Sequence, residues 1–126
     1  MKLATSAPVF ALALLAATAA FAAAPVKTAD SAKGKVLTDE KGMTLYTFKN
    51  DTKGVSVCND DCAKAWPPFA ADGNAEASGA YTVIDRKDGT KQWAKDGMPL
   101  YFFVKDKKAG DVSGDGVKGI WDVAKP

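Results

Sequence analysis

Cys58 and Cys62 are the two cysteines of this 126-residue chain, and their spacing limits the chemistry that they can do. A Cys-x-x-x-Cys spacing can bring the two α-carbons within bridging range in a turn or an irregular helix. In an exported protein, such a pair is most often a disulfide. The bridge closes a short loop, so loop-closure entropy predicts a stabilisation of about 2 kcal/mol. We expect a structural disulfide, with a redox-active pair and a thiolate metal site as alternatives.

Two other groups of residues could act as metal ligands. Met43 and Met98 carry thioether sulfurs that suit cuprous copper, but both lie in strand-like segments, which favours packing in the core. Asp106, Asp111 and Asp115 lie among glycines, but their loop lacks the alternating Asp ladder and the terminal Glu of an EF-hand. Turn formation explains these aspartates better than calcium binding. We expect no metal site and no cofactor.

The chain contains no histidine. This excludes the imidazole general base, Ser-His and Cys-His nucleophile pairs, and zinc or haem held by histidine. No nucleophile motif, phosphate loop or paired-carboxylate signature stands out. Enzyme activity is therefore the less favoured interpretation, and no catalytic residue is predicted.

An internal repeat organises the chain. When the sequence is shifted against itself by 55 positions, ten of the 25 positions from 42 to 66 are identical without a gap. Unrelated segments would match at about one or two positions. The first copies are Gly42, Met43, Leu45, Tyr46, Phe48, Asp51, Lys53, Val57, Asp60 and Trp66, and the second are Gly97, Met98, Leu100, Tyr101, Phe103, Asp106, Lys108, Val112, Asp115 and Trp121.

Each part of the repeated unit has a physical role. The Gly closes a turn, the Met, Leu, Tyr and Phe supply both faces of a strand, and the Asp accepts hydrogen bonds from amides of the following loop. The Trp returns to pack on the strand. We expect these aromatic residues to form a core shared by two copies in a pseudo-twofold relation, with an aromatic ligand surface as the alternative. The positions that match Cys58 and Cys62 are Ser113 and Val117, which favours a structural bridge.

The elements around the repeat are strand-like. Residues 35–38 and 43–48 predict a hairpin, and residues 81–84, 90–94 and 98–103 predict a meander with two Asp-Gly turns. Pro99 cannot donate to a ladder, so we expect its strand at an edge or paired only after the proline. A short strand over 119–123 ends the chain, and residues 59–66 favour one or two helical turns. The predicted fold is all-β, mainly antiparallel, in one small domain.

The N-terminus resembles a secretory signal peptide. Lys2 precedes an apolar, alanine-rich run, and small residues offer cleavage after Ala22 or Ala24. We therefore expect residues 1–24 to be a cleaved signal, 25–32 a flexible tether, and 33–126 the folded domain, with repeats over about 36–69 and 91–124. No cysteine stands at the cleavage point, and a net charge near zero argues against nucleic acid. No stable membrane anchor is expected after cleavage.

The motifs resemble those of the secreted-repeat family of predicted bacterial lipoproteins, marked by Tyr-x-aromatic-x-x-Asp. Residues 46–51 and 101–106 match that motif, and the resemblance continues through Trp66-Pro67-Pro68 and the glycine-rich ending over 110–121. The resemblance implies an exported protein of uncharacterised function. The chain departs from the lipoprotein members in lacking the lipidated cysteine, which favours a soluble periplasmic or secreted protein.

Three functional hypotheses follow. The first is a non-catalytic binding or cell-envelope-associated module that uses aromatic edges or loops to contact an unknown ligand or envelope partner. The second is redox or copper handling in the periplasm through Cys58 and Cys62 or the methionines. The third is a hydrolase that uses aspartates.

Overall fold

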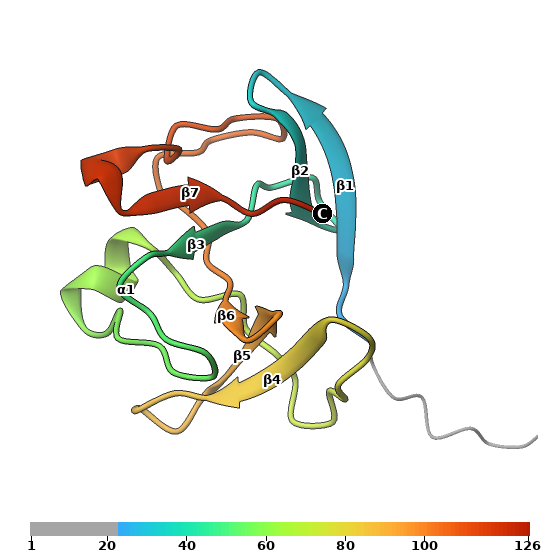
Figure 1. Ribbon diagram of the computed structural model, residues 1–126, viewed down its shortest axis with the longest axis vertical. Coiled ribbons are helices and arrows are strands. Elements are labelled where there is room, and N and C mark those ends of the chain that lie inside the picture. Colours follow the sequence, from blue (N-terminus) through green and yellow to red (C-terminus); the bar gives the residue numbers. More distant parts are fainter. Residues whose placement is uncertain (1–22) are drawn as a thin grey trace, which may run out of the picture.

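The computed structural model describes residues 23–126, so the predicted signal peptide lies outside the described residues except for its last two positions. The chain forms mainly short strands (Figure 1). In order, the elements are β1 (Val26–Ser31), β2 (Gly34–Asp39), β3 (Tyr46–Phe48), α1 (Asp61–Ala65), β4 (Tyr81–Asp85), β5 (Lys91–Lys95), β6 (Met98–Pro99), the 3₁₀ helix η1 (Val117–Gly119) and β7 (Trp121–Val123).

The strands form three antiparallel sheets, which confirms the predicted all-β class. The sheets are β1-β2, β3-β7 and β4-β5-β6. The predicted meander corresponds to β4-β5-β6, in which Pro99 lies in the edge strand β6. The predicted helical turns correspond to α1. None of the helices over residues 23–126 is both long enough and apolar enough to cross a membrane.

Residues 25–32 differ from the predicted tether. Val26–Ser31 form β1, which pairs with β2 over its whole length, from Val26 opposite Asp39 to Ser31 opposite Gly34. The segment lacks a clear apolar alternation because half of its side chains are exposed and none is fully buried. Its position is fixed by backbone hydrogen bonds, which carry no strong sequence signal. The hairpin β1-β2 matches β4-β5 at the same shift of 55 residues.

The two repeats exchange their Trp-bearing ends. β3 of the first repeat pairs with β7 of the second, with Phe48 opposite Trp121. The corresponding strand of the second repeat pairs with the first, because Tyr101 forms a bridge with Pro68 and Phe102 donates its N–H to the carbonyl of Pro67 at 2.7 Å. Each repeat therefore completes its central strand with a segment of the other.

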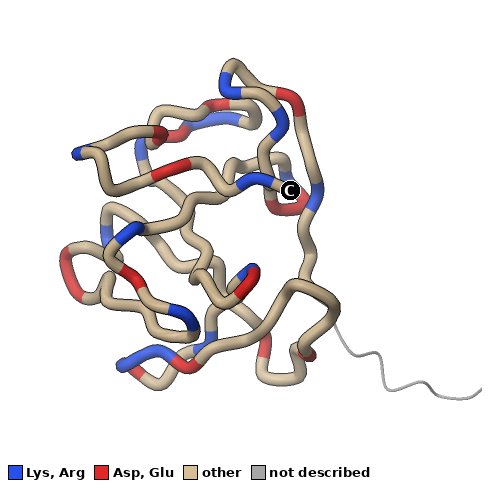
Figure 2. The backbone as a smooth tube through the Cα atoms, in the orientation of Figure 1, with Lys and Arg blue, Asp and Glu red and all other residues tan. Residues whose placement is uncertain are grey.

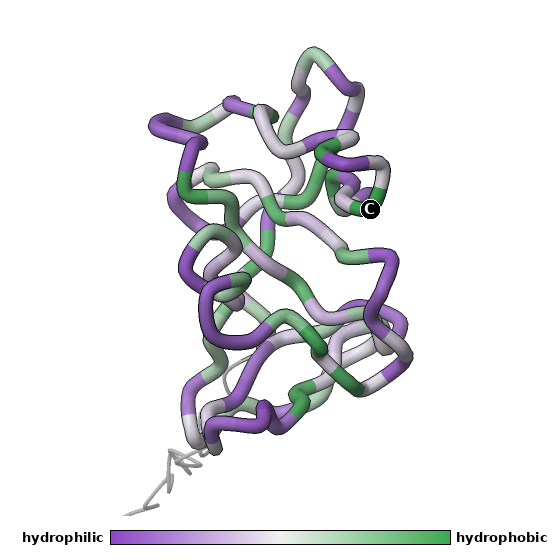
Figure 3. Tube along the Cα trace, turned by 90° about the vertical axis from the view of Figure 1, so that its left-hand side faces the viewer, coloured by the Kyte–Doolittle hydropathy of each residue, from purple (hydrophilic) through white to green (hydrophobic). Residues whose placement is uncertain are grey.

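Two apolar clusters make up the core. One is mainly aromatic and lies between the repeats, and the other surrounds Leu37, Leu45, Phe69, Trp93 and Leu100. Hydrophobic stretches run through the middle of the fold and hydrophilic stretches lie at its turns (Figure 3). Lysines and acidic residues alternate along the loops without gathering on one side (Figure 2). The charge distribution therefore favours no single binding face.

Candidate binding sites at the repeat interface

Four aromatic rings form one continuous stack between the repeats. Their order is Phe48, Trp121, Trp66, Phe103, with centroid distances of 4.2, 3.8 and 4.0 Å. The two tryptophans are almost parallel, at 2°. Phe48 matches Phe103 and Trp66 matches Trp121 at the 55-residue shift, so the stack reads the same from either end. This order is what a pseudo-twofold axis between the tryptophans requires.

The motif tyrosines lie edge-on to this stack and connect the repeats. Tyr46 meets Trp66 at 5.4 Å and 79°, and Tyr101 meets Trp121 at 5.2 Å and 89°. The two tyrosines also exchange backbone hydrogen bonds of 2.8 and 3.0 Å, each N–H donating to the other's carbonyl. The rings of the motif are therefore core residues, as the repeat pattern favoured.

Each motif aspartate accepts a hydrogen bond from the tyrosine of the other repeat. Tyr101 donates to Asp51 at 2.6 Å, and Tyr46 donates to Asp106 at 2.5 Å. Each aspartate also accepts a loop amide, from Val57 at 2.8 Å and from Ser113 at 2.9 Å, which is the loop bond expected from the sequence. The motif thus binds the two repeats to each other and orders both following loops.

Burial changes the titration of these groups. Loss of hydration, followed by the hydrogen bond to a carboxylate, raises the pKa of both Tyr46 and Tyr101 far above the ordinary tyrosine value. Loss of hydration also raises the pKa of Asp51, although Tyr101, the Val57 amide and Arg86 oppose that shift. Both tyrosines therefore remain protonated donors at neutral pH.

The disulfide between Cys58 and Cys62 is present and spans the loop that leads into α1. Cys58 is completely buried, whereas Cys62 is half-buried and packs against the aromatic stack. Attack by an external thiolate requires access to a sulfur atom. Burial of Cys58 prevents attack on that sulfur, which leaves only the half-buried Cys62 within reach of a thiolate.

A groove, which we call the tryptophan groove, lies over the stack and encloses about 390 Å³. Its floor is formed by Phe48, Trp66 and Trp121. One wall comes from α1 and the other from η1 and the residue after it, and the two walls are pseudo-equivalent because Cys62 and Ala65 match Val117 and Ile120. Asp61 and Lys118 also line it. The groove is therefore built by both repeats on their common axis.

Arg86 is a buried residue that the sequence analysis did not single out. Its guanidinium donates to four neutral oxygens: Oγ of Ser56 at 2.9 Å, Oε1 of Gln92 at 2.8 Å, the carbonyl of Cys58 at 2.7 Å and Oδ1 of Asn59 at 3.3 Å. The hydroxyl of Ser56 lies 2.6 Å from that of Tyr101. Because the hydroxyl proton of Tyr101 is donated to Asp51, Ser56 donates to Tyr101. This series of hydrogen bonds connects the Arg86 cation to the Asp51 carboxylate.

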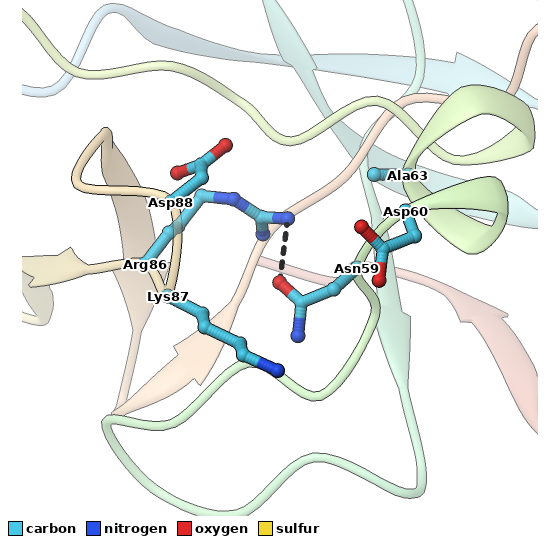
Figure 4. Close-up of a pocket in the computed structure, with 6 residues that line it drawn as sticks. All are labelled: Asn59, Asp60, Ala63, Arg86, Lys87 and Asp88. Atoms are coloured by element: carbon cyan, nitrogen blue, oxygen red, sulfur yellow. Dashed lines mark hydrogen bonds between the residues drawn. The ribbon is translucent and has the colours of Figure 1, made fainter.

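A small hollow lies beside Arg86 and encloses about 260 Å³. Figure 4 shows it between the start of α1 and the β4-β5 turn, with Asn59, Asp60 and Ala63 on one side and Arg86, Lys87 and Asp88 on the other. The one sequence signal for this site is that Arg86 is the only arginine in a lysine-rich chain. Arg86 lies outside the residues matched by the repeat comparison, so that comparison did not identify it.

The remaining predicted residues have structural positions. Gly42 and Gly97 adopt positive φ at equivalent turns, and a Cβ there would lie 3.0 Å from Ala109 and Lys53 respectively. Leu45 and Leu100 are fully buried in the second cluster. Within residues 23–126, no group of three or more cysteine or acidic side chains is arranged to hold a metal ion.

The methionines differ from expectation. Met43 and Met98 are only half-buried and belong to neither apolar cluster; Met43 follows the Gly42 turn, and Met98 is the first residue of the edge strand β6. The packing of these two side chains is therefore looser than that of the motif leucines and aromatic residues. Both positions remain equivalent in the two repeats.

A comparison with protein families identifies the repeat. A family model described as a secreted repeat of unknown function matches residues 27–70 and 82–125. The chain belongs to this family. The two matched secreted repeats are separated by the same 55 residues as the motif, and each begins within the first strand of a hairpin, β1 or β4. They therefore start earlier than the predicted bounds of 36 and 91. Neither a curated protein nor a solved structure matches the chain.

Proposed function

We propose that this secreted-repeat protein is a non-catalytic binding module of the periplasm, and that the tryptophan groove binds a flat, largely apolar group. The observation that carries the proposal is the position of the groove, which both repeats build on their common axis. Export is supported by the family description and by the predicted signal peptide, and the disulfide suits an oxidising compartment.

The chemistry of the groove favours an aromatic ligand. Both faces of Trp66 and of Trp121 are covered by neighbouring rings of the stack, so a ligand in the groove meets ring edges rather than ring faces. The edge of an aromatic ring is electropositive and attracts the electronegative face of a second ring, in the arrangement that Tyr46 and Tyr101 already adopt. Asp61 and Lys118 would contact polar substituents at the ends of the ligand.

Methyl NMR tests this proposal directly. The chain contains two isoleucines, of which Ile120 lines the groove and Ile84 is buried in β4. With ¹³C-methyl-labelled isoleucine, titration with indole should move the Ile120 signal saturably and leave the Ile84 signal in place. No movement of the Ile120 signal up to the solubility limit of indole, or equal linear drift of both signals, would contradict the proposal.

A matched pair of variants localises the effect. Val117 lines the groove, whereas Val104 is 43% exposed and does not line it. A carboxylate in the groove must be desolvated when an apolar ligand binds, so Val117→Asp should weaken indole binding about tenfold or more. Val104→Asp adds the same charge outside the groove and should leave binding unchanged. Equal losses in both variants would place the binding elsewhere.

A further inference from the structure

Arg86 is a buried cation without a carboxylate partner. Arg86 is only 5% exposed, and the oxygens that accept its hydrogen bonds are all neutral. The ion pairs among residues 23–126 are all formed by lysines. Asp51 is connected to Arg86 only through two hydroxyl groups. A buried charge is costly unless an opposite charge lies close to it.

One nitrogen of Arg86 also lacks a hydrogen-bond partner. Within the described residues, Nε of Arg86 is the one buried side-chain nitrogen or oxygen without a partner. An unpaired buried donor destabilises the folded state. The bond from Nη2 to Asn59, at 3.3 Å, is the longest of the four that the guanidinium makes. The guanidinium thus keeps one unused donor, and Arg86 is also one of the residues that line the hollow.

The hollow beside Arg86 carries charges of both signs. Lys87 and Arg86 contribute two cations, and Asp60 and Asp88 contribute two carboxylates. Figure 4 shows the ends of Lys87 and Asn59 extending into the same space, with Asp60 across from Arg86. At about 260 Å³ the hollow lies below the usual size of sites for drug-sized ligands. Its charges and volume suit a small molecule that carries both a carboxylate and an ammonium group.

We infer that the hollow beside Arg86 is a second ligand site, which binds a small zwitterion with the charge pattern of a free amino acid. The carboxylate lies against the two cations, Arg86 and Lys87. The ammonium group faces Asp60, across the hollow from Arg86, and Ala63 leaves room for a small side chain. This site is separate from the tryptophan groove and does not depend on it.

The test uses the single arginine as its reporter. One arginine gives one side-chain Nε–H signal in a ¹⁵N NMR spectrum of the protein, and burial slows its exchange with water. Three probes are titrated at equal ionic strength: alanine, N-acetylalanine, which lacks the ammonium group, and alaninamide, which lacks the carboxylate. Alanine should shift the Nε–H signal saturably, and each of the other two should bind at least about tenfold more weakly.

Two variants locate the site without removing the buried guanidinium. Asp60 is exposed and makes no side-chain cap to α1, so Asp60→Asn keeps its shape and removes one charge. Lys87→Gln removes a cation from the opposite side of the hollow. Each should weaken alanine binding several-fold, whereas Lys105→Gln, an exposed site outside the hollow, should not. The Ile120 signal should stay in place during alanine titration in all four proteins.

Three results would overturn the inference. The first is an Nε–H signal that does not move with alanine at any soluble concentration. The second is equal binding of alanine and N-acetylalanine, which would indicate a simple anion site. The third is equal weakening by all three variants, which would indicate a general charge effect. Failure of indole to bind in the groove bears only on the proposed function.

Discussion

The two ends of the repeat interface have the same motif bonds and different surroundings. At the first, which we call the Arg86 end, Arg86 donates to Ser56, Ser56 to Tyr101 and Tyr101 to Asp51. At the second, the Gly114 end, the backbone N–H of Gly114 donates to Tyr46 at 3.2 Å, and Tyr46 donates to Asp106. The donor to the motif tyrosine is thus a backbone amide at the Gly114 end, and the Ser56 hydroxyl, itself bound to Arg86, at the Arg86 end.

This difference separates what the repeat requires from what one end adds. Both ends keep the Tyr–Asp pair and an ordered loop, because those bonds hold the repeats together. The Arg86 end adds a disulfide, a buried cation and the small hollow. The Gly114 end instead fits its loop against the aromatic rings with a glycine. Function-specific features are therefore expected at the Arg86 end and in the groove between the ends.

The largest effect is expected at the Gly114 end, where close packing leaves no room for a side chain. A Cβ on Gly114 would lie 2.8 Å from both Trp66 and Tyr46. Gly114→Ala should therefore lower the free energy of unfolding by about 3 kcal/mol, measured by urea denaturation. Gly73→Ala is the matched control, because nothing lies within 4 Å of that position and its φ is not positive. A similar loss in both variants would contradict tight packing at this end.

Removing the tyrosine hydroxyls compares the two ends directly. Tyr101→Phe should cost about 2–3 kcal/mol because Oδ2 of the buried Asp51 loses its donor and the Ser56 hydroxyl loses its acceptor. Tyr46→Phe removes a bond to Asp106 and one from a backbone amide, and should cost less. Urea denaturation of both variants measures the difference. A larger cost for Tyr46→Phe would show that the Arg86 network does not strengthen its end.

The disulfide should stabilise only the end that contains it. Replacing Cys58 and Cys62 by alanine should cost about 2 kcal/mol at most, because the closed loop is short. Amide hydrogen exchange should become faster at Val57, next to this loop, and stay unchanged at Ser113 in the equivalent loop. Faster exchange at both amides would indicate that the bridge supports the whole interface.

The smallest effect concerns pH. Since burial raises the pKa of Asp51 in the folded state, its ionised form is disfavoured there, and the resulting loss of stability is present at neutral pH. Acidification from neutral pH towards the ordinary aspartate pKa of about 3.9 removes this loss. The stability difference between wild type and Asp51→Asn should therefore grow in favour of wild type as the pH falls. If the advantage of wild type over Asp51→Asn shrinks as the pH falls, the pKa of Asp51 is lowered in the folded state and not raised.

The sequence predicted the composition of the interface better than its connections. The 55-residue shift identified Tyr46, Phe48, Trp66 and their partners as a shared core, because identical residues at a fixed spacing indicate equivalent environments. It could not show that β3 pairs with β7, since a self-comparison does not distinguish pairing within a repeat from pairing between repeats. Arg86 was missed because a single buried cation produces no periodic pattern.

The central claim is that the repeats exchange their Trp-bearing ends, so that neither forms a core alone. The most direct measurement is the folding of residues 23–76 and 77–126 as separate fragments, by circular dichroism and one-dimensional NMR. Each fragment should be unfolded by itself, and mixing the two should restore the dispersed spectrum of the intact protein. Independent folding of either fragment, with its own tryptophan packed on its own central strand, would contradict the exchange.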